Sequence, residues 1–526
     1  MKRHSFISRL ASLAVVCGLT LAFASCANDD LAQNGKTSTE DKGLTAFSTG
    51  EPATRTTMEA DGKFYWEAGD KIWVKDDSGN WKQSSNSPTG KTASFKFLMP
   101  GKYTAKSSYE VYYPGKNGNK DKVTISANQT QTEPNTTAHF GASGDCGIAK
   151  ATRNATSHEF EFALDHKAAY LVFKPYTSND VLKYCYLTKI EVTSDNDIAS
   201  TSTYTLDPTA ATGTGALTGT GNGKQIVLTT KGNYGSTYQN GFPLTNTSAS
   251  LTTNGAYMVI KPGTHTLRIR YWVKDVATQI EGTITKIIPS HTFAKNEYVN
   301  MEADLQIKNY DGDKYYMWDA QQNYWSGHEW NSAAPWQPVL NNTSNGNYPK
   351  SNTDHRYYHE HSGSGRFDAT QSCATLPNAN EMSWYVMFGD AHWDDDELWT
   401  TMGHLHKCGI WLKKKSVLQG EHHYDTEKSA DGSTDLRTTY KYYQKSGINN
   451  SGLPSAADAN KYFYLPALGY YESGQLYYVG ASGGNYWSSS VVPLGGGVAY
   501  ALGFIRGLVD VGGGSCDRGF RVGGVE

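Results

Sequence analysis

Cysteine is scarce in this sequence, and neither sign of charge is in clear excess. The 526 residues include 7 cysteines, and no two of them have the CxxC spacing, which argues against a zinc site or a dense disulfide framework. The 48 basic and 51 acidic side chains nearly balance at a formal charge of −3. Because no basic stripe is available to neutralise phosphates, we expect no nucleic-acid partner.

Long runs of helix-forming residues are also missing. Glycine (53 residues) and tyrosine (35 residues) are abundant instead, together with Thr, Ser and Asn. Beta-branched and aromatic residues fit a pleated sheet, and Gly and Asn fit the turns between strands. The composition therefore predicts many short strands. At about 100–200 residues per domain, the length predicts roughly three domains.

Residues 1–26 have the layout of an export signal. Three basic side chains among the first nine residues precede the apolar run 10–23, which is too short to span a bilayer as a mature helix. Ala24 and Ser25 then lead to Cys26, which resembles a bacterial lipoprotein signal whose cysteine receives the lipid. Phe23 stands where that pattern usually has Leu, Val or Ile. The alternative is a simple secretory signal with an incidental cysteine.

The segment after Cys26 is polar. Ala27-Asn28-Asp29-Asp30 resembles the surface-export signal of Bacteroidetes lipoproteins, which implies a lipid-anchored position on the outer membrane, at the cell surface. Residues 27–53 have few large apolar side chains, so we interpret them as a flexible tether. No later apolar run is long enough for a membrane helix, and the lipid is therefore the expected anchor.

From residue 54 the pattern changes to short apolar runs broken by Gly, Asn, Asp and Pro, which is typical of β-sandwiches. Strands are predicted at 72–74, 108–113, 160–164, 170–173, 190–192, 225–229, 257–260, 266–273, 282–288 and 298–305.

Several of these segments resemble the fimbrillin proteins of Bacteroidetes. The matching motifs are Trp66-x-x-Gly69-Asp70-x-Ile72-x-Val74, Tyr112-Tyr113-Pro114, Phe160-x-Phe162-x-Leu164-x-His166-Lys167-Ala168-Ala169 and Phe293-Ala294-Lys295-Asn296-x-Tyr298. Ala294 stands where the family usually has Gly. The resemblance implies two tandem fimbrillin-like β-sandwiches, at 54–178 and 179–306. It also implies trimming after an arginine, which frees a groove for strand exchange with other pilus subunits. Arg55 is the residue where such a cut would fall, although an arginine in a polar linker is common anyway.

Residues 307–526 have a different character. Their order of motifs, from Ala374-Thr375-Leu376-Pro377-Asn378 through Leu465-Pro466-Ala467 and Asn485-Tyr486-Trp487-Ser488-Ser489-Ser490 to Arg518-Gly519-Phe520-Arg521-Val522, resembles the Fibrobacter major paralogous domain and its C-type lectin-like relatives. The implied fold is mixed α/β with two helices. We expect these at 378–388, with Asn380 as N-cap, and at 454–461. Residues 415–450 are interpreted as an exposed insertion.

The stretch 488–525 contains no Lys, Glu, Gln, Met or Trp. Each of its residues can be encoded by a codon that ends in C, which resembles the variable region of a diversity-generating-retroelement target protein. Ala499, Tyr500, Leu502 and Phe504 form a framework that alternates as a buried face should. The alternative is a Gly-rich irregular sheet with an ordinary fluctuation in composition.

Under the first interpretation, the variable side chains project to one exposed ligand-binding surface. We expect this surface to comprise Val491, Val492, Pro493, Leu494, Val498, Ala501, Gly503, Ile505, Arg506, Leu508, Asp510, Cys516, Asp517 and Arg518. Val, Leu, Ile and Arg among glycines suit contact with a protein.

Evidence for a metal, a cofactor or catalysis is weak. The acidic stretch 390–397 is the best metal candidate, but a solvated acidic loop is the favoured interpretation. One disulfide, Cys373–Cys408, is weakly supported. The motif at 518–522 also resembles the end of formylglycine-generating enzymes, which need two nearby cysteines, whereas Cys516 alone is present. We therefore predict no cofactor and no enzymatic activity.

Two functions fit the sequence. The first is a lipid-anchored adhesin or receptor-like binding protein, in which the two sandwiches form a stalk and 307–526 recognises a protein or glycan on a host, bacterial or phage surface. The second is a structural anchor or tip subunit of a pilus assembled by strand exchange. A third, a surface glycan-processing enzyme, has no supporting residues.

Sequencing the 3′ end of the gene from related isolates tests the diversification hypothesis. Differences should be concentrated in codons 491–523 and should fall on the first two bases of codons that end in C. A stretch no more variable than residues 50–305 would contradict it.

Overall fold

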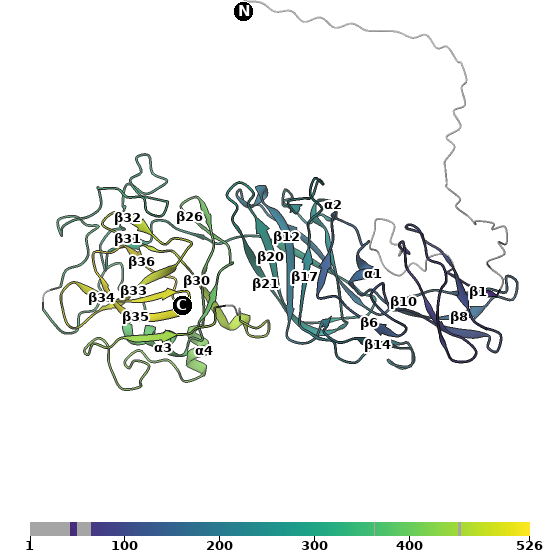
Figure 1. Ribbon diagram of the computed structural model, residues 1–526. Helices are drawn as coiled ribbons and strands as arrows, with labels where there is room; N and C mark the ends of the chain where they lie inside the picture. Colours follow the sequence, from purple (N-terminus) through teal and green to yellow (C-terminus); the bar gives the residue numbers. More distant parts are fainter. Residues whose placement is uncertain (1–42, 50–64, 362, 451–453) are drawn as a thin grey trace, which may run out of the picture. The chain divides into compact units, whose positions relative to one another are not determined.

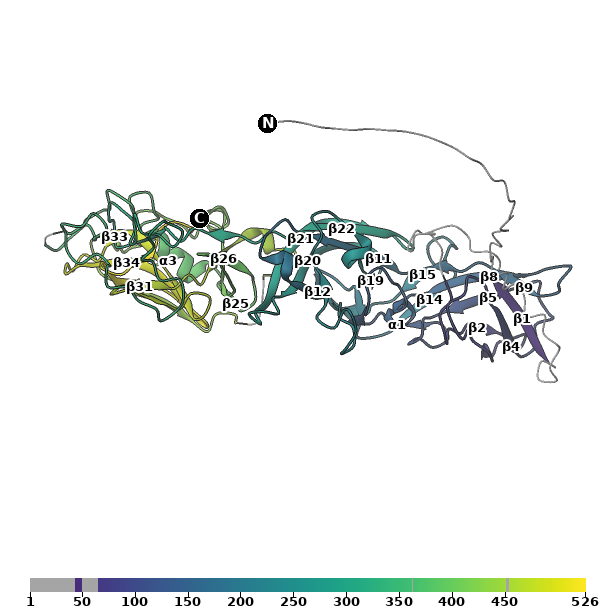
Figure 2. The same cartoon turned by 90° about the horizontal axis from the view of Figure 1, so that it is seen from above.

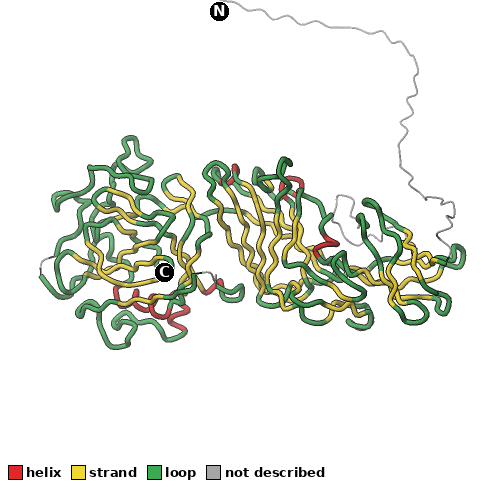
Figure 3. The backbone as a smooth tube through the Cα atoms, viewed as in Figure 1, coloured by secondary structure: helices red, strands yellow, loops and turns green. Residues whose placement is uncertain are grey.

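The computed structural model describes residues 43–49, 65–361, 363–450 and 454–526. Strands dominate these residues and helices are few and short (Figure 3), so the prediction of a mainly β chain is confirmed. Thr45–Glu526 form one compact unit. Within it, the buried apolar residues define three lobes, each with its own sheets (Figure 1). In the described part of the chain, no helix has the length and apolar character needed to cross a membrane.

An eight-stranded sheet builds the first lobe. Its order is β3-β2-β5-β8-β9-β1-β4, and β10 pairs with β8. Aromatic side chains, among them Tyr109 and Phe160, fill its core. The strands are β1 Leu44–Thr49, β2 Trp73–Lys75, β3 Trp81–Gln83, β4 Lys96–Pro100, β5 Ser108–Tyr113, β8 Gly147–Arg153, β9 Phe160–Phe162 and β10 Asp165–His166.

Strand β1 corrects the tether prediction. It lies between β9 and β4 (Figure 2) and pairs in parallel with β9. Phe47 is fully buried and stacks on Phe160, with ring centroids 4.9 Å apart. The interpretation of 27–53 as tether is therefore wrong for 44–49, because one aromatic side chain in a polar stretch is enough to hold a strand in an aromatic core.

The second lobe has a six-stranded sheet, β21-β20-β12-β17-β7 with β18 on β12, and a three-stranded sheet, β19-β11-β22. Residues of both sheets, such as Phe173 and Tyr271, share one core. Its elements are β6 Lys122–Val123, β7 Asn128–Thr130, α1 Phe140–Ser143, β11 Ala169–Tyr176, η1 Leu182–Tyr184, β12 Tyr186–Ser194, β13 Ala199–Ser200, β14 Tyr204–Asp207, β15 Ala216–Thr218, β16 Asn222–Gly223, β17 Gln225–Thr229, β18 Phe242–Pro243, α2 Leu251–Asn254, β19 Ala256–Ile260, β20 Gly263–Lys274, β21 Glu281–Phe293 and β22 Tyr298–Asp304.

The predicted boundary at 178/179 does not separate these lobes. Strand β7 pairs with β17, and β11, which ends at Tyr176, pairs with β19 and β22. The chain thus enters the second lobe, returns to the first at β8, and leaves it again before β11. A local pattern of strands and turns does not reveal such pairing between distant segments.

The third lobe combines small sheets with helices. Its largest sheet runs β24-β36-β33-β34-β35-β29, and smaller ones run β23-β26-β27, β25-β28-β30 and β31-β32. Its elements are β23 Asn309–Tyr310, β24 Tyr315–Tyr316, α3 Ala379–Phe388, β25 His392–Asp394, β26 Trp399–Thr401, β27 His404–His406, β28 Gly409–Lys413, α4 Lys415–Gly420, β29 Tyr443–Ser446, η2 Ala459–Lys461, β30 Tyr462–Pro466, β31 Tyr470–Glu472, β32 Gln475–Tyr477, β33 Gly483–Val491, β34 Val498–Ile505, β35 Leu508–Ser515 and β36 Phe520–Arg521.

The helix predictions are right in part. α3 occupies the expected place, but Asn378 is its N-cap, not Asn380, because Asn378 and Glu381 form a capping box. The expected helix at 454–461 is only the 3₁₀ turn Ala459–Lys461 in its described residues. The stretch 415–450, interpreted as an insertion, contributes α4 and β29 to the lobe.

The disulfide that the sequence left possible, Cys373–Cys408, does not form. Cys373 and Cys408 are free thiols buried in separate apolar clusters, so no bridge joins them. The other three cysteines of the described chain are also free and buried.

The acidic stretch 390–397 is not a solvated loop. Asp394 is buried and forms an ion pair of 3.0 Å with Arg270 of β20. Its carboxylate also accepts hydrogen bonds from the backbone N–H groups of Asp396 and Glu397 and from the Trp411 indole. The stretch therefore joins the second lobe to the third through a fully partnered buried charge.

Removing the Asp394 carboxylate tests its contribution to the contact between the second and third lobes. Asp394→Ala leaves the buried Arg270 guanidinium with only the more distant Asp396 carboxylate, at 4.0 Å, and we expect the free energy of unfolding to fall by about 3–5 kcal/mol in urea titrations. Asp368→Ala is the matched control, since the Asp368–Arg366 pair is half exposed and is worth less than about 1 kcal/mol. Equal losses in the two variants would contradict the assignment.

The neighbouring Glu397 predicts a pH dependence. Burial, and then the Asp394 charge, raise the pKa of the Glu397 carboxyl from 4.5 to about 7. Between these values the folded protein keeps a proton that the unfolded chain has released, so the free energy of unfolding falls as pH rises through this window. Glu397→Gln should flatten that fall in urea titrations at pH 5 and pH 8. If the free energy of unfolding of Glu397→Gln changes with pH as much as that of the unaltered protein, the assignment to Glu397 is wrong.

Candidate functional site

The stretch 488–525 forms the centre of the largest sheet of the third lobe. Figure 1 shows β33, β34 and β35 together, with α3 beside them. Tyr500, Leu502 and Phe504 are buried in the same core as Met382 and Tyr385 of α3. The predicted framework is confirmed for these three residues, because alternate residues of β34 point into this core, whereas Ala499 is buried in a smaller core on the other face.

The expected single exposed surface is wrong for five residues. Val491, Val492, Pro493, Ala501 and Cys516 are buried. Val491, Ala501 and Cys516 pack with Trp318 and Trp487 in a second, smaller core on the other face of the sheet. Their side chains therefore stabilise the lobe and cannot contact a ligand without rearrangement.

The remaining part of that other face is open. A row of facing residues crosses four strands: Asn485 of β33 pairs with Gly503 of β34, Gly503 with Asp510 of β35, and Asp510 with Gln444 of β29. Because the row lies at one level of the sheet, these residues share a face. A Cβ atom on Gly503 would lie 2.5 Å from Asp510 Oδ1 and 3.5 Å from Asn485 Oδ1, so these two oxygens converge over the bare backbone of Gly503.

Apolar and aromatic side chains flank this polar row. On one side, Ile505 pairs with Leu508, and Leu508 with Ser446; the Ile505 side chain is 49% exposed. On the other side, the Tyr442 ring lies over Gly512, where a Cβ atom would be 2.8 Å from it. We call this set the open face: Tyr442, Gln444, Ser446, Asn485, Gly503, Ile505, Leu508, Asp510 and Gly512.

Asp510 is the charged residue of the open face. Burial raises the pKa of its carboxyl, and the Tyr442 hydroxyl, which donates a hydrogen bond of 2.7 Å to Oδ2, partly offsets that rise. Burial and this carboxylate raise the pKa of Tyr442 to about 12. The Tyr442 hydroxyl and the Gly503 backbone N–H thus hold the carboxylate at a fixed position, and it can accept further hydrogen bonds, which favours a ligand that supplies donors.

The other predicted site residues lie elsewhere. Leu494 belongs to the β33–β34 connection, Val498 begins β34, and Arg506 pairs with Asp395 at 3.3 Å. Arg518 donates hydrogen bonds to Glu472, and the Ser515 hydroxyl donates one to Asp517. Of the predicted set, the structure brings together Gly503, Ile505, Leu508 and Asp510. Cys26 and Arg55 lie outside the described residues.

The sequence analysis missed the part of the site that comes from β29 and β33. Tyr442, Gln444 and Ser446 lie in or beside the stretch interpreted as an insertion, and Asn485 precedes the variable stretch. The alternation of Tyr443, buried in the core, with exposed Tyr442 and Gln444 was the available signal for a strand.

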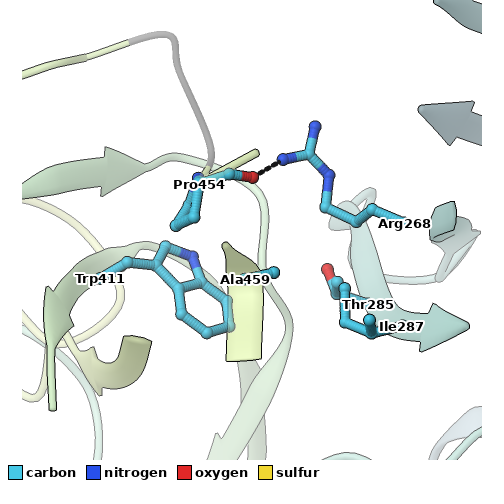
Figure 4. A pocket seen from close by; sticks show the side chains of 6 residues that line it. All are labelled: Arg268, Thr285, Ile287, Trp411, Pro454 and Ala459. Carbon is cyan, nitrogen blue, oxygen red and sulfur yellow. Dashed lines mark hydrogen bonds between the residues drawn. The ribbon is translucent and has the colours of Figure 1, made fainter. Parts of the chain in front are cut away.

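A cavity of about 110 Å³ lies between β20, β21 and residues of the third lobe (Figure 4). Arg268, Thr285, Ile287, Trp411, Pro454 and Ala459 line it. The Arg268 guanidinium donates to the Pro454 carbonyl oxygen, and the Thr285 hydroxyl donates to Glu397. The lining has no pair of groups suited to acid–base or nucleophilic chemistry.

Two further chemical possibilities find no support. Gly480-Ala481-Ser482-Gly483-Gly484 has the G-x-S-x-G spacing, but it leads from β32 into strand β33, whereas a nucleophile turn leads into a helix. In the described ranges, no three His, Cys, Asp or Glu side chains are grouped so that they could hold a metal ion.

No protein-family model and no curated protein sequence matches the chain. Solved structures with partial similarity include a fimbrial protein from Bacteroides ovatus, at 10% identity and TM-score 0.25 over 91% of this chain and 98% of that chain. A fimbrial assembly protein from Parabacteroides distasonis matches at 13% and 0.24 over 50% and 91%, and the fimbrial anchor protein Mfa2 from Porphyromonas gingivalis at 10% and 0.22 over 49% and 90%. At such TM-scores these similarities define neither the fold nor the function of this chain.

Proposed function

We propose that the chain is a lipid-anchored cell-surface adhesin or receptor-like protein whose third lobe binds a ligand on another surface. The open face carries this proposal. It combines exposed apolar side chains, an aromatic ring and a polar row on a rigid sheet, which is the combination of groups that protein recognition uses. The opposite face of the same sheet packs on α3, so its buried residues can be retained while the residues of the open face change.

The sequence supports the rest of the proposal. The export signal ending at Cys26 supports lipid attachment to the outer membrane. The fimbrillin-like motifs support two tandem sandwiches as a stalk, and the motifs of 307–526 support a C-type lectin-like head. The composition of 488–525 supports diversification, in which Gly503, Ile505, Leu508 and Asp510 would be replaceable contact residues and Tyr500, Leu502 and Phe504 would be retained.

Adhesion of cells that display the full chain tests this proposal. Ile505→Asp together with Leu508→Asp places two unpaired charges on the open face, and we expect adhesion to target cells to fall at least tenfold, as for loss of a binding hot spot. Leu340→Asp is the control, since Leu340 is similarly exposed, at 53%, but lies in a loop beside β32. Undiminished adhesion by the double variant, at equal surface display, would refute the proposal.

A second candidate, a pilus anchor or tip subunit, is favoured by the position of β1. This strand is an interior member of the first sheet, and Arg55 follows it in the sequence. A cut after Arg55 would separate β1 from the rest of the chain and leave β9 and β4 with unpaired edges for a donated strand.

Mass spectrometry of the mature surface protein tests this second candidate. Assembly by this route predicts a chain that starts at Thr56 and forms higher assemblies that resist dilution, whereas Arg55→Ala should leave the chain whole and unassembled. A lipid-modified, uncut chain within assembled pili would contradict it.

A further inference from the structure

Asp510 is a partly buried carboxylate to which the protein supplies no cation. Among the described residues, no Lys, Arg or His nitrogen lies within 4 Å of it, and the side chain that donates a hydrogen bond to it is the neutral Tyr442 hydroxyl. The nearest candidates in sequence are engaged elsewhere: Arg506 pairs with Asp395, and Lys445 donates to the Met387 carbonyl oxygen on the α3 side of the sheet. A desolvated carboxylate without a counter-charge favours a cationic partner.

The Tyr442 ring offers a surface for that cation. One side of the ring lies on the backbone of Gly512, and its hydroxyl is fixed by Asp510. The residue is 44% exposed, so the other side of the ring is open to solvent. A guanidinium or ammonium group over such a ring gains a cation–π contact in addition to its ion pair.

Leu508 and Ile505 lie one row away from Asp510 on the same face. Long basic side chains bury their methylene stems on apolar surface while the charged head makes polar contacts. The spacing of the apolar row, the carboxylate and the ring therefore matches one side chain of this kind, with its stem on Leu508 and its head between Asp510 and Tyr442.

We propose that the open face recognises a protein partner through an exposed basic side chain, preferably arginine, which pairs with Asp510 and stacks on Tyr442. The planar guanidinium suits both contacts, because it bonds carboxylates in a fork and stacks on aromatic faces. This inference rests on the proposed binding function and specifies its partner. A neutral glycan is the competing ligand, and it would use the same ring without needing the charge of Asp510.

Saturation-transfer NMR on the full chain tests the proposal with three probes: N-acetyl-arginine amide, its neutral isostere N-acetyl-citrulline amide, and methyl β-galactoside. The arginine probe should bind best and should weaken as salt is added, because the contact is an ion pair. Asp510→Asn keeps the size of the side chain and should reduce binding of the arginine probe about tenfold. The double variant Asp510→Asn, Tyr442→Leu should bind the arginine probe more weakly than Asp510→Asn alone.

Asp368→Asn is the matched control, because it neutralises an exposed carboxylate of the same lobe away from the open face. Equal binding of the citrulline probe, retention of arginine binding in Asp510→Asn, preferential binding of the galactoside, or no binding of any probe would each overturn the inference. If adhesion is lost in the Ile505→Asp, Leu508→Asp variant but the arginine probe does not bind, the proposed binding function is supported and the basic partner is rejected. Retained adhesion in that variant removes both.

Discussion

The buried ion pair between Arg270 and Asp394 is the constraint that connects the third lobe to the second. A carboxylate removed from water is tolerated only where its lone pairs are occupied, and Asp394 accepts bonds from the guanidinium, two backbone N–H groups and an indole. These partners fix the segment that carries Trp393, whose ring contacts Phe504 of β34. The contacts of Asp394 therefore also help to position β34, the strand that carries part of the open face.

The face of the large sheet that lies opposite α3 has a covered half and an open half. Where Trp487, Ala501 and Gly514 meet, the aromatic rings of the smaller core cover the face, and Gly514 leaves room for Phe520. Where Asn485, Gly503 and Asp510 meet, the face is only half-buried. The change from a covered to an open face occurs within two residues along β34, from Ala501 to Gly503, so both halves belong to the same strand. A substitution in the covered half would act through folding, whereas one in the open half would leave the two cores of the lobe intact.

Some strands and the buried face of β34 could be predicted from the sequence because their cause is local. The alternation of Tyr500, Leu502 and Phe504 specifies which face of β34 is buried, and β5 and β17 begin and end where their apolar runs do. Other elements depend on partners far away in the sequence. Phe47 belongs to a strand because of Phe160, and Asp394 is buried because of Arg270; no pattern within either segment contains that information.

The sequence by itself determined a mainly β chain, the alternating framework of the stretch 488–525 and the absence of a chain-wide charge bias, since these follow from composition and from the two-residue period of a strand. Only the tertiary structure decided that Val491, Ala501 and Cys516 are buried while Ile505 and Asp510 form an open face with Tyr442 and Gln444. The reason is physical, because exposure depends on which segment packs against a sheet face. The covering Trp318 donates a hydrogen bond to the Ser488 carbonyl oxygen, 170 residues away along the chain, and the edge strand β29 joins the sheet by pairing Gln444 with Asp510 of β35.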